Sequence, residues 1–181
     1  MPGRIDENIP FRPLRIAVLT VSDSRDERSD RSGAVLVERL QAAGHLLAAR
    51  DIVRDEVEQI AARLRAWIED PAIEVVLTTG GTGVTGRDVT PEALAMVAEK
   101  RIPGFGELFR WLSYAKIGTS TIQSRADAGV ARGTYIFCLP GSPGACRDAW
   151  DDILATQLDI RYRPCNFAEM MPRLREHEPG G

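Results

Sequence analysis

The pattern of apolar and polar residues in the first half of the chain predicts strands that alternate with helices. Leu14 to Val21 is an almost continuous apolar run with isoleucine and two valines, typical of a strand buried on both faces. Gly33 to Ala43 has apolar residues at helical spacing, and Gly44 follows as expected after a helix C-terminus. Leu46 to Val53 predicts a second strand, and Val57 to Trp67 predicts an amphipathic helix.

The second half of the chain continues this alternation. Thr90-Pro91-Glu92 predicts a helix start, with Thr90 as N-cap, proline at the first helical position and an acid in the first turn. The other expected elements are strands at Ile73 to Leu77 and Tyr135 to Leu139, and helices over Gly104 to Ala115, Thr119 to Ala131 and Gly144 to Leu158.

Alternating strands and helices predict an α/β fold whose mostly parallel sheet is covered by helices on both faces. We expect one α/β domain over residues 14–172, between a flexible N-terminal arm of residues 1–13 and a C-terminal tail of residues 173–181. The three tryptophans stand at helical spacing among apolar neighbours, so we expect them in the core or in a subunit interface.

Composition narrows the function classes. With 181 residues the chain buries enough surface for a core without a disulfide or a structural metal. A net charge of -3 argues against nucleic acid as the main partner. Its apolar runs are also far shorter than the roughly 20 residues that span a membrane, so no membrane association is expected.

Cysteine and histidine are too few for a framework of disulfides or for a histidine-based catalytic or metal site. Cys138, Cys146 and Cys165 form no CxxC pair, which indicates reduced thiols. Because the N-terminus has no apolar signal core either, we expect a cytoplasmic protein. With only two histidines, catalysis has to depend on carboxylates, hydroxyls, backbone amides and arginines.

In sheets of this kind ligands bind at the carboxyl ends of the strands. Four segments fall there: Ser22 to Arg25, Asp55 with Glu56, Gly80 to Asp88, and Pro140 to Pro143. Thr78-Thr79-Gly80-Gly81-Thr82-Gly83 is the sharpest local signal, because glycine amides can line an anion-binding nest to which threonine hydroxyls add donors. A tight turn without a ligand is the alternative interpretation.

Gly81 to Gly86 also matches the dinucleotide fingerprint G-x-G-x-x-G, which would suggest a nucleotide-dependent oxidoreductase. The context disfavours it, since the predicted helix begins at Thr90, beyond the glycines, and the first strand has no glycines after it.

Two carboxylates lie at the same predicted edge of the sheet. Asp88 follows the glycine loop and Asp55 follows the second strand, so both could converge on one Mg²⁺ beside bound phosphates. Asp88 as a turn acid and Asp55 as a helix N-cap are the alternatives. Pro140-Gly141-Ser142 and Ser22 offer amides and hydroxyls at two other strand ends, although each segment is also an ordinary connector.

Taken in order, these segments resemble the MoaB/MogA family of molybdenum cofactor biosynthesis proteins, over residues 14 to 172. The residues that carry the resemblance are Thr20-Val21-Ser22-Asp23-Ser24, Asp51-Ile52-Val53 with Asp55-Glu56, Thr78 to Gly83, Arg87-Asp88-Val89-Thr90-Pro91-Glu92, Ile102-Pro103-Gly104-Phe105-Gly106-Glu107, Ser124-Arg125 and Leu139-Pro140-Gly141.

The resemblance implies a three-layer αβα sandwich that assembles as a trimer or as a hexamer of two trimers. It implies adenylylation of molybdopterin with Mg-ATP, giving adenylyl-molybdopterin and pyrophosphate. Catalytic and metal-binding roles would fall on Asp55 and Asp88. Contacts to molybdopterin and ATP would fall on Ser22, Thr79, Gly80, Gly81, Thr82, Gly83, Ser124, Arg125, Pro140, Gly141 and Ser142.

An alternative within the same pathway is a molybdopterin-binding or assembly protein without catalytic activity, since a fold does not guarantee its chemistry. Contacts with other cofactor biosynthesis proteins are compatible with either function. The sequence leaves open the choice between trimer and hexamer, the preferred divalent metal, and whether the pathway carries molybdenum or tungsten.

Overall fold

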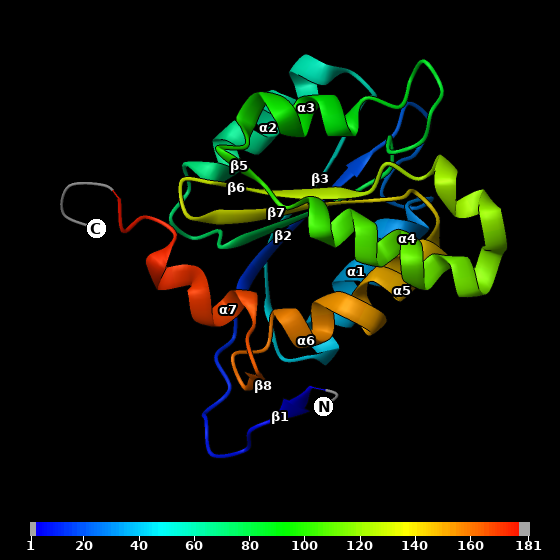
Figure 1. The fold of residues 1–181 in the computed structure, drawn as a ribbon. Helices are drawn as coiled ribbons and strands as arrows, with labels where there is room; N and C mark the ends of the chain where they lie inside the picture. Colours follow the sequence, from blue (N-terminus) through cyan, green and yellow to red (C-terminus); the bar gives the residue numbers. More distant parts are fainter. Residues whose placement is uncertain (1–2, 178–181) are drawn as a thin grey trace.

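A six-stranded sheet forms the centre of the computed structural model, which describes residues 3–177 (Figure 1). In spatial order the strands are β3 (Leu46–Val53), β2 (Arg15–Val21), β4 (Val75–Thr79), β7 (Thr134–Leu139), β6 (Asp127–Ala131) and β5 (Lys100–Arg101). The first four are parallel, whereas β6 runs antiparallel to β7 and β5 antiparallel to β6. The mostly parallel α/β sheet expected from the sequence is confirmed.

Helices cover both faces of this sheet, and alternate residues of β2 show how the core divides. Ile16 and Val18 belong to the core under one set of helices, and Ala17 and Leu19 to the core under the other. The first set is α1 (Arg31–Ala42), α4 (Pro103–Ile117) and α5 (Pro143–Ala149); the second is α2 (Val57–Ile68) and α3 (Thr90–Val97) (Figure 1). This is the expected three-layer αβα sandwich.

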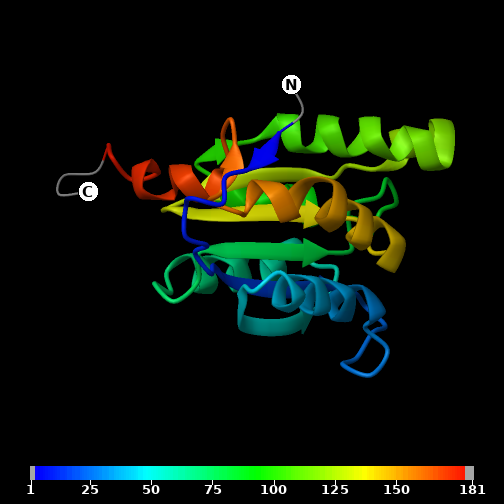
Figure 2. The ribbon, with the colours of Figure 1, turned by 90° about the horizontal axis from the view of Figure 1, so that it is seen from below.

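A two-stranded sheet below the first layer joins the N-terminal segment to the chain that follows α6. The strand β1 (Arg4–Ile5) pairs antiparallel with β8 (Tyr162–Arg163), and Figure 2 shows the N-terminal segment running beneath the sheet toward β2. Phe11 packs on His45 with ring centroids 5.2 Å apart. Residues 1–2 of the expected arm and residues 178–181 of the expected tail lie outside the described residues.

The remaining elements are short. After α5 the chain continues as a π-helical turn (Trp150–Leu154) and α6 (Ala155–Gln157), and α7 (Phe167–Met170) and the 3₁₀ helix Met171–Arg173 follow β8. No helix among residues 3–177 combines the length and the apolar character that crossing a bilayer requires.

The helix expected over Thr119 to Ala131 is wrong. Gly118, with φ +60°, ends α4, the residues Gly118–Gln123 form a 3₁₀ helix, and Asp127–Ala131 form β6. Arg132 and Gly133, with φ +48° and +87°, make the two-residue turn of a β-hairpin with β7. The alanines of this segment favour a helix locally whereas Gly129 and Val130 do not, and the ladders with β7 and β5 decide the conformation.

The N-cap expected at Thr90 is also wrong. Val89 occupies the cap position without a side-chain cap bond, and Thr90 is the first helical residue of α3. The Thr90 hydroxyl instead donates to the Gly80 carbonyl at 2.8 Å. Its polar group therefore ties the helix to the glycine turn that follows β4.

The strand order sets the position of the site. The chain passes from β2 to β3 on one side of β2, and then returns to β4 on the other side. Such a reversal leaves a crevice at the carboxyl ends of the strands, because the two connections run over opposite faces of the sheet. Here the segments after β2, β4 and β7 meet at this crevice.

Candidate functional site

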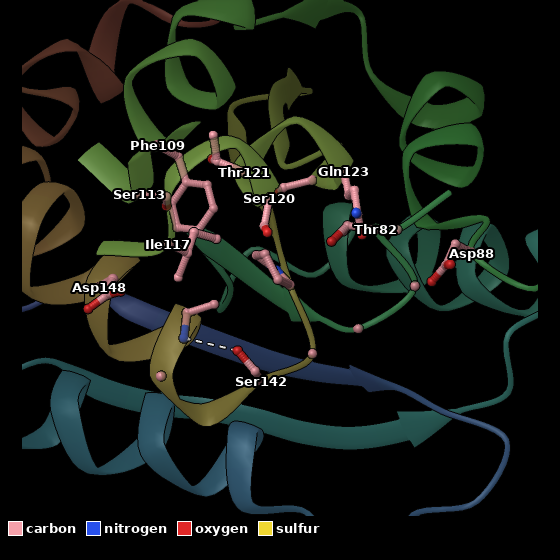
Figure 3. Close-up of a pocket in the computed structure, with 18 of the residues that line it drawn as sticks. Thr82, Asp88, Phe109, Ser113, Ile117, Ser120, Thr121, Gln123, Ser142 and Asp148 are labelled. Atoms are coloured by element: carbon pink, nitrogen blue, oxygen red, sulfur yellow. Dashed lines mark hydrogen bonds between the residues drawn. The ribbon is translucent and has the colours of Figure 1, made fainter. Parts of the chain in front are cut away.

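A pocket of about 650 Å³ opens at this crevice (Figure 3). One wall is formed by the segments that follow β2, β4 and β7, and the other by the end of α4 with the 3₁₀ helix Gly118–Gln123. Its size falls within the usual range for small-molecule sites. Of the residues expected from the sequence, the pocket is lined by Ser22, Asp55, Gly80, Gly81, Thr82, Gly83, Asp88, Ser124, Pro140, Gly141 and Ser142.

The glycine turn is held in a conformation that few other residues adopt. Gly80 and Gly81 have φ of +104° and +64°. A Cβ at Gly80 would lie 2.2 Å from the Val21 carbonyl oxygen, and one at Gly81 would lie 2.4 Å from Thr90 Oγ1. The carbonyls of Gly80 and Gly81 accept hydrogen bonds from the hydroxyl and the backbone N–H of Thr90. Both carbonyls are thereby engaged with α3, which makes the turn a rigid rim of the pocket.

Asp88 closes the loop that leaves this turn. Its Oδ2 accepts hydrogen bonds from the Thr85 backbone N–H at 2.9 Å and from the Thr85 hydroxyl at 2.6 Å. Burial raises the pKa of Asp88, but these bonds, the Gly83 N–H and the charge of Arg125 outweigh burial and hold it below its ordinary value. Asp88 therefore stabilises the turn, which was the alternative interpretation of its position in the sequence. Its ionised carboxylate also lines the pocket.

Asp55 lies beside the same turn, and its carboxylate has the opposite pKa shift. A Cβ at Gly81 would lie 3.2 Å from Asp55 Oδ1. Burial is the largest cause that raises the pKa of Asp55, and the negative charges of Asp23 and Asp88 raise it further. The Asp23 backbone N–H and the charge of Arg87 lower it, but their effect is smaller. Glu56 holds the N-cap position of α2, so Asp55 does not cap that helix. Like charges crowded next to backbone amides make a setting that a cation would stabilise.

Arg87 links the glycine loop to the segment after β2. Its Nε and Nη2 donate to the two carboxylate oxygens of Asp23 at 2.9 and 2.8 Å. Asp23 in turn accepts from the Asp55 backbone N–H at 3.3 Å. Three strand-end segments are thus joined at the side of the pocket that carries the aspartates.

The segment after β7 enters α5 at the floor of the pocket. Ser142 is the N-cap of α5, and its Oγ accepts from the Ala145 N–H at 3.1 Å (dashed line in Figure 3). Pro143 occupies the first helical position. Gly141 approaches the glycine turn so closely that a Cβ would lie 3.2 Å from the Gly80 Cα.

Two of the expected contact residues lie outside the pocket. Thr79 is fully buried, and its hydroxyl donates to the Pro140 carbonyl at 2.9 Å. Arg125 lies behind the glycine loop, where it bonds to the Gly83 and Asp88 carbonyls and pairs with Glu92. It lines a separate groove with Arg101 and Arg110.

The structure also adds lining residues that were not among the expected contact residues. Arg25 donates to Ser32 Oγ at 2.7 Å and to the Gly141 carbonyl at 2.8 Å, so it connects the segments after β2 and β7. Its place just after the first strand was the only available signal. The opposite wall carries Phe109, Ser113, Lys116, Ile117, Ser120, Thr121, Gln123 and Asp148, several of which point into the pocket in Figure 3. Ser120, Thr121 and Gln123 went unnoticed because Thr119 to Ala131 was assigned to a single helix, and the others because their helices carry no local signal for a site.

The described residues contain no cluster of three or more histidine, cysteine, aspartate or glutamate side chains that could hold a metal ion. Two carboxylates alone are typical of Mg²⁺ sites in which substrate phosphates and waters complete the coordination shell.

Comparison with known proteins gives consistent matches. Residues 17–159 match the family model described as "Probable molybdopterin binding domain". The chain is 53% identical over 157 residues to molybdenum cofactor biosynthesis protein B of Escherichia coli strain K12, covering 87% of this chain and 92% of that protein.

Two solved structures are similar over most of their length. One is a crystal structure of molybdenum cofactor biosynthesis protein B, with a TM-score of 0.82 and 38% identity, covering 91% of this chain and 98% of that chain. The other is the tungsten cofactor synthesizing protein MoaB from Pyrococcus furiosus, with a TM-score of 0.72 and 36% identity, covering 80% of this chain and 92% of that chain.

Proposed function

The chain belongs to the molybdenum cofactor biosynthesis protein B family, and from this premise we propose that it adenylylates molybdopterin with Mg-ATP. The observation that carries the proposal is one pocket in which Asp55 and Asp88 adjoin a rigid glycine turn. Carboxylates next to phosphate-binding amides would repel the substrate unless a divalent cation stood between them.

The donor set fits Mg²⁺. Asp55 and Asp88 would supply carboxylate oxygens, the ligands this ion prefers, and phosphate oxygens and waters would complete its shell. Burial, and then the charges of Asp23 and Asp88, raise the pKa of Asp55, so a bound cation would stabilise its ionised form. When bound, the ion would neutralise charge on the phosphates of ATP.

The chain's own residues would position the reactants. A phosphate oxygen of molybdopterin forms a bond to the α-phosphorus of ATP while the bond to the β-phosphate oxygen breaks, and pyrophosphate leaves. Amides of the turn Gly80 to Gly83 would hold phosphate oxygens, and Ser22, Ser124, Gly141 and Ser142 would contact the two substrates. Catalysis by positioning and charge stabilisation needs no covalent protein nucleophile.

The decisive experiment measures pyrophosphate release from Mg-ATP by the purified protein, with and without molybdopterin. We expect release that depends on molybdopterin and on Mg²⁺. Asp88→Ala should lower the rate by at least about 100-fold, corresponding to about 3 kcal/mol in the barrier, because the carboxylate that orients the metal is lost.

Circular dichroism of Asp88→Ala checks that the fold survives the substitution. A preparation that binds molybdopterin but releases no pyrophosphate would refute adenylylation and favour the non-catalytic binding or assembly protein. An Asp88→Ala variant with full activity would refute the role assigned to this residue.

The proposal extends to assembly and location. We infer a homotrimer or a hexamer of two trimers, supported by the exposed apolar side chains Leu108, Trp111, Tyr114, Ile117 and Ile122 on α4 and the 3₁₀ helix that follows it. Cytoplasmic location is supported by Cys138, Cys146 and Cys165, which are free thiols. Other cofactor biosynthesis proteins are candidate partners.

A further inference from the structure

Arg125 closes the base of the loop that carries Asp88, and it does so from outside the pocket. Its Nε donates to the Gly83 carbonyl at 2.6 Å and its Nη2 donates to the Asp88 carbonyl at 2.5 Å. These two carbonyls stand at the two ends of the loop from Gly83 to Asp88. One guanidinium therefore joins the residue where the loop leaves the glycine turn to the residue where it ends.

Two other sets of contacts hold the loop: Arg87 pairs with Asp23 in the segment after β2, and Thr85 and Asp88 bond to each other. Thr85 donates its N–H and hydroxyl to the Asp88 carboxylate, and the Asp88 N–H donates to the Thr85 carbonyl at 3.1 Å. At the tip of the loop the side chain of Val84 is 66% exposed, and Gly86 has no atom within 4 Å of where a Cβ would lie. The tip has little packing of its own, so the position of the loop depends on its base and on the exposed Arg87–Asp23 pair.

The guanidinium is itself held in place. Glu92, in the first turn of α3, pairs with Nη1 and Nη2 of Arg125. The Arg125 backbone N–H donates to the Thr82 carbonyl at 2.8 Å. Because α3 is also bound to the glycine turn through Thr90, the loop and helix form one hydrogen-bonded unit.

A planar guanidinium suits this task, because its five fixed N–H donors can satisfy two carbonyls and a carboxylate at once. An ammonium group is a single point and cannot reach both ends of the loop with the same geometry. Arg125 lines the neighbouring groove with Arg101 and Arg110, and it does not line the pocket of Asp55 and Asp88.

We propose that Arg125 is a positioning residue, a clasp that fixes the loop of Asp88 and acts on the reaction only through that aspartate. This inference rests on the proposed adenylylation for its kinetic consequence, but the clasp itself is a property of the loop. It replaces the direct substrate contact that the sequence suggested for Arg125.

The clasp is tested without any activity measurement by hydrogen–deuterium exchange of the full chain. In Arg125→Ala the Thr85 and Asp88 amides should exchange at least about tenfold faster, because two hydrogen bonds from a charged donor are lost. Exchange in α1, on the opposite face of the sheet from α3, should stay unchanged. Arg125→Lys should not restore protection.

The matched control is Arg101→Ala. Arg101 lies in the same groove and pairs with the Asp127 carboxylate, but it makes no bond to the loop. It should leave the exchange of Thr85 and Asp88 unchanged. Unchanged exchange of these amides in Arg125→Ala, or faster exchange throughout the chain, would overturn the clasp.

Kinetics then separate positioning from substrate contact. For Arg125→Ala we expect kcat to fall about 10- to 100-fold while the KM for molybdopterin changes by less than about threefold, since a displaced carboxylate affects the reacting step and not binding. A raised KM with unchanged kcat and unchanged exchange would restore the substrate contact. If the wild-type protein shows no turnover, the exchange result still decides the clasp, while the proposed function fails separately.

Discussion

Gly80 illustrates how a single residue constrains the site. Its φ of +104° lies in the left-handed region, and the Val21 carbonyl oxygen lies 2.2 Å from the position of a Cβ. The neighbouring atom belongs to the backbone of β2 and cannot rotate away. Any side chain would therefore push the end of β4 away from the end of β2, where the pocket begins.

Gly80→Ala should lower the free energy of unfolding by at least about 2 kcal/mol, since it combines an unfavourable φ with a backbone clash. Gly86→Ala, in the loop that follows the glycine turn, is the matched control, because open space surrounds the position of a Cβ at Gly86. It should change stability by less than about 0.5 kcal/mol. Urea denaturation of the two variants measures both values, and equal stabilities would contradict the clash at Gly80.

At the scale of an element, α1 begins on a buried charged residue. Asp30 is 2% exposed, and as N-cap it accepts from the Gly33 N–H at 2.9 Å. Its Oδ2 accepts from the Thr20 hydroxyl at 2.7 Å and pairs with Arg50 at 2.9 Å. This carboxylate therefore connects the start of α1 to β2 and β3. Burial raises the pKa of Asp30, but the bonds from Arg50, Thr20 and Gly33 outweigh it and hold the pKa below its ordinary value.

Asp30→Ala should cost at least about 2 kcal/mol of stability, since it removes a cap and leaves the Arg50 guanidinium and the Thr20 hydroxyl without this partner. Ser142→Ala removes only the cap of α5 and should cost about 1 kcal/mol. Thermal melting compares the two.

The pH dependence of stability follows from the sign of the Asp30 shift. Because the folded pKa is depressed, the stabilising contribution is complete above the unfolded value and is lost as pH falls through the folded pKa. The difference between wild type and Asp30→Ala should therefore shrink below about pH 4. A constant difference down to lower pH would contradict the charged role of Asp30.

For the whole molecule, the outer face of α4 is the surface that remains to be explained. Trp67 and Trp150 are buried in the two cores, as expected, but Trp111 is 72% exposed. Ile122, on the following 3₁₀ helix, is 75% exposed. Such large apolar side chains gathered on the surface of a folded domain mark an interaction surface, and the proposed self-assembly would cover them.

Trp111→Arg should therefore convert the assembly into monomers, because a charge would be desolvated at the centre of the proposed interface. Met96→Arg, at an exposed position of α3 on the opposite layer, is the control and should leave the assembly unchanged. Analytical ultracentrifugation measures both masses. A wild-type monomer, or an intact trimer of Trp111→Arg, would contradict the proposed interface.

The sequence by itself determined the elements that are long or bear strong local signals. The runs of β2 and β7 are apolar enough to require burial, and Gly44, with φ +89°, ends α1 as expected. Because parallel strands place their carboxyl ends at one edge of a sheet, the sequence also predicted that Asp55, Asp88 and the glycine turn would meet there. All three line one pocket.

Only the tertiary structure decided the features that depend on distant partners. Asp127–Ala131 is a strand because it forms backbone hydrogen bonds with β7 on one side and β5 on the other, although its alanines alone favour a helix. Consequently the part of the pocket wall formed by Gly118–Gln123 and the outward position of Arg125 were not predictable, since both follow from that hairpin. The physical reason is that local sequence sets conformational preference, whereas hydrogen bonds and packing between distant segments set which side of a loop each side chain occupies.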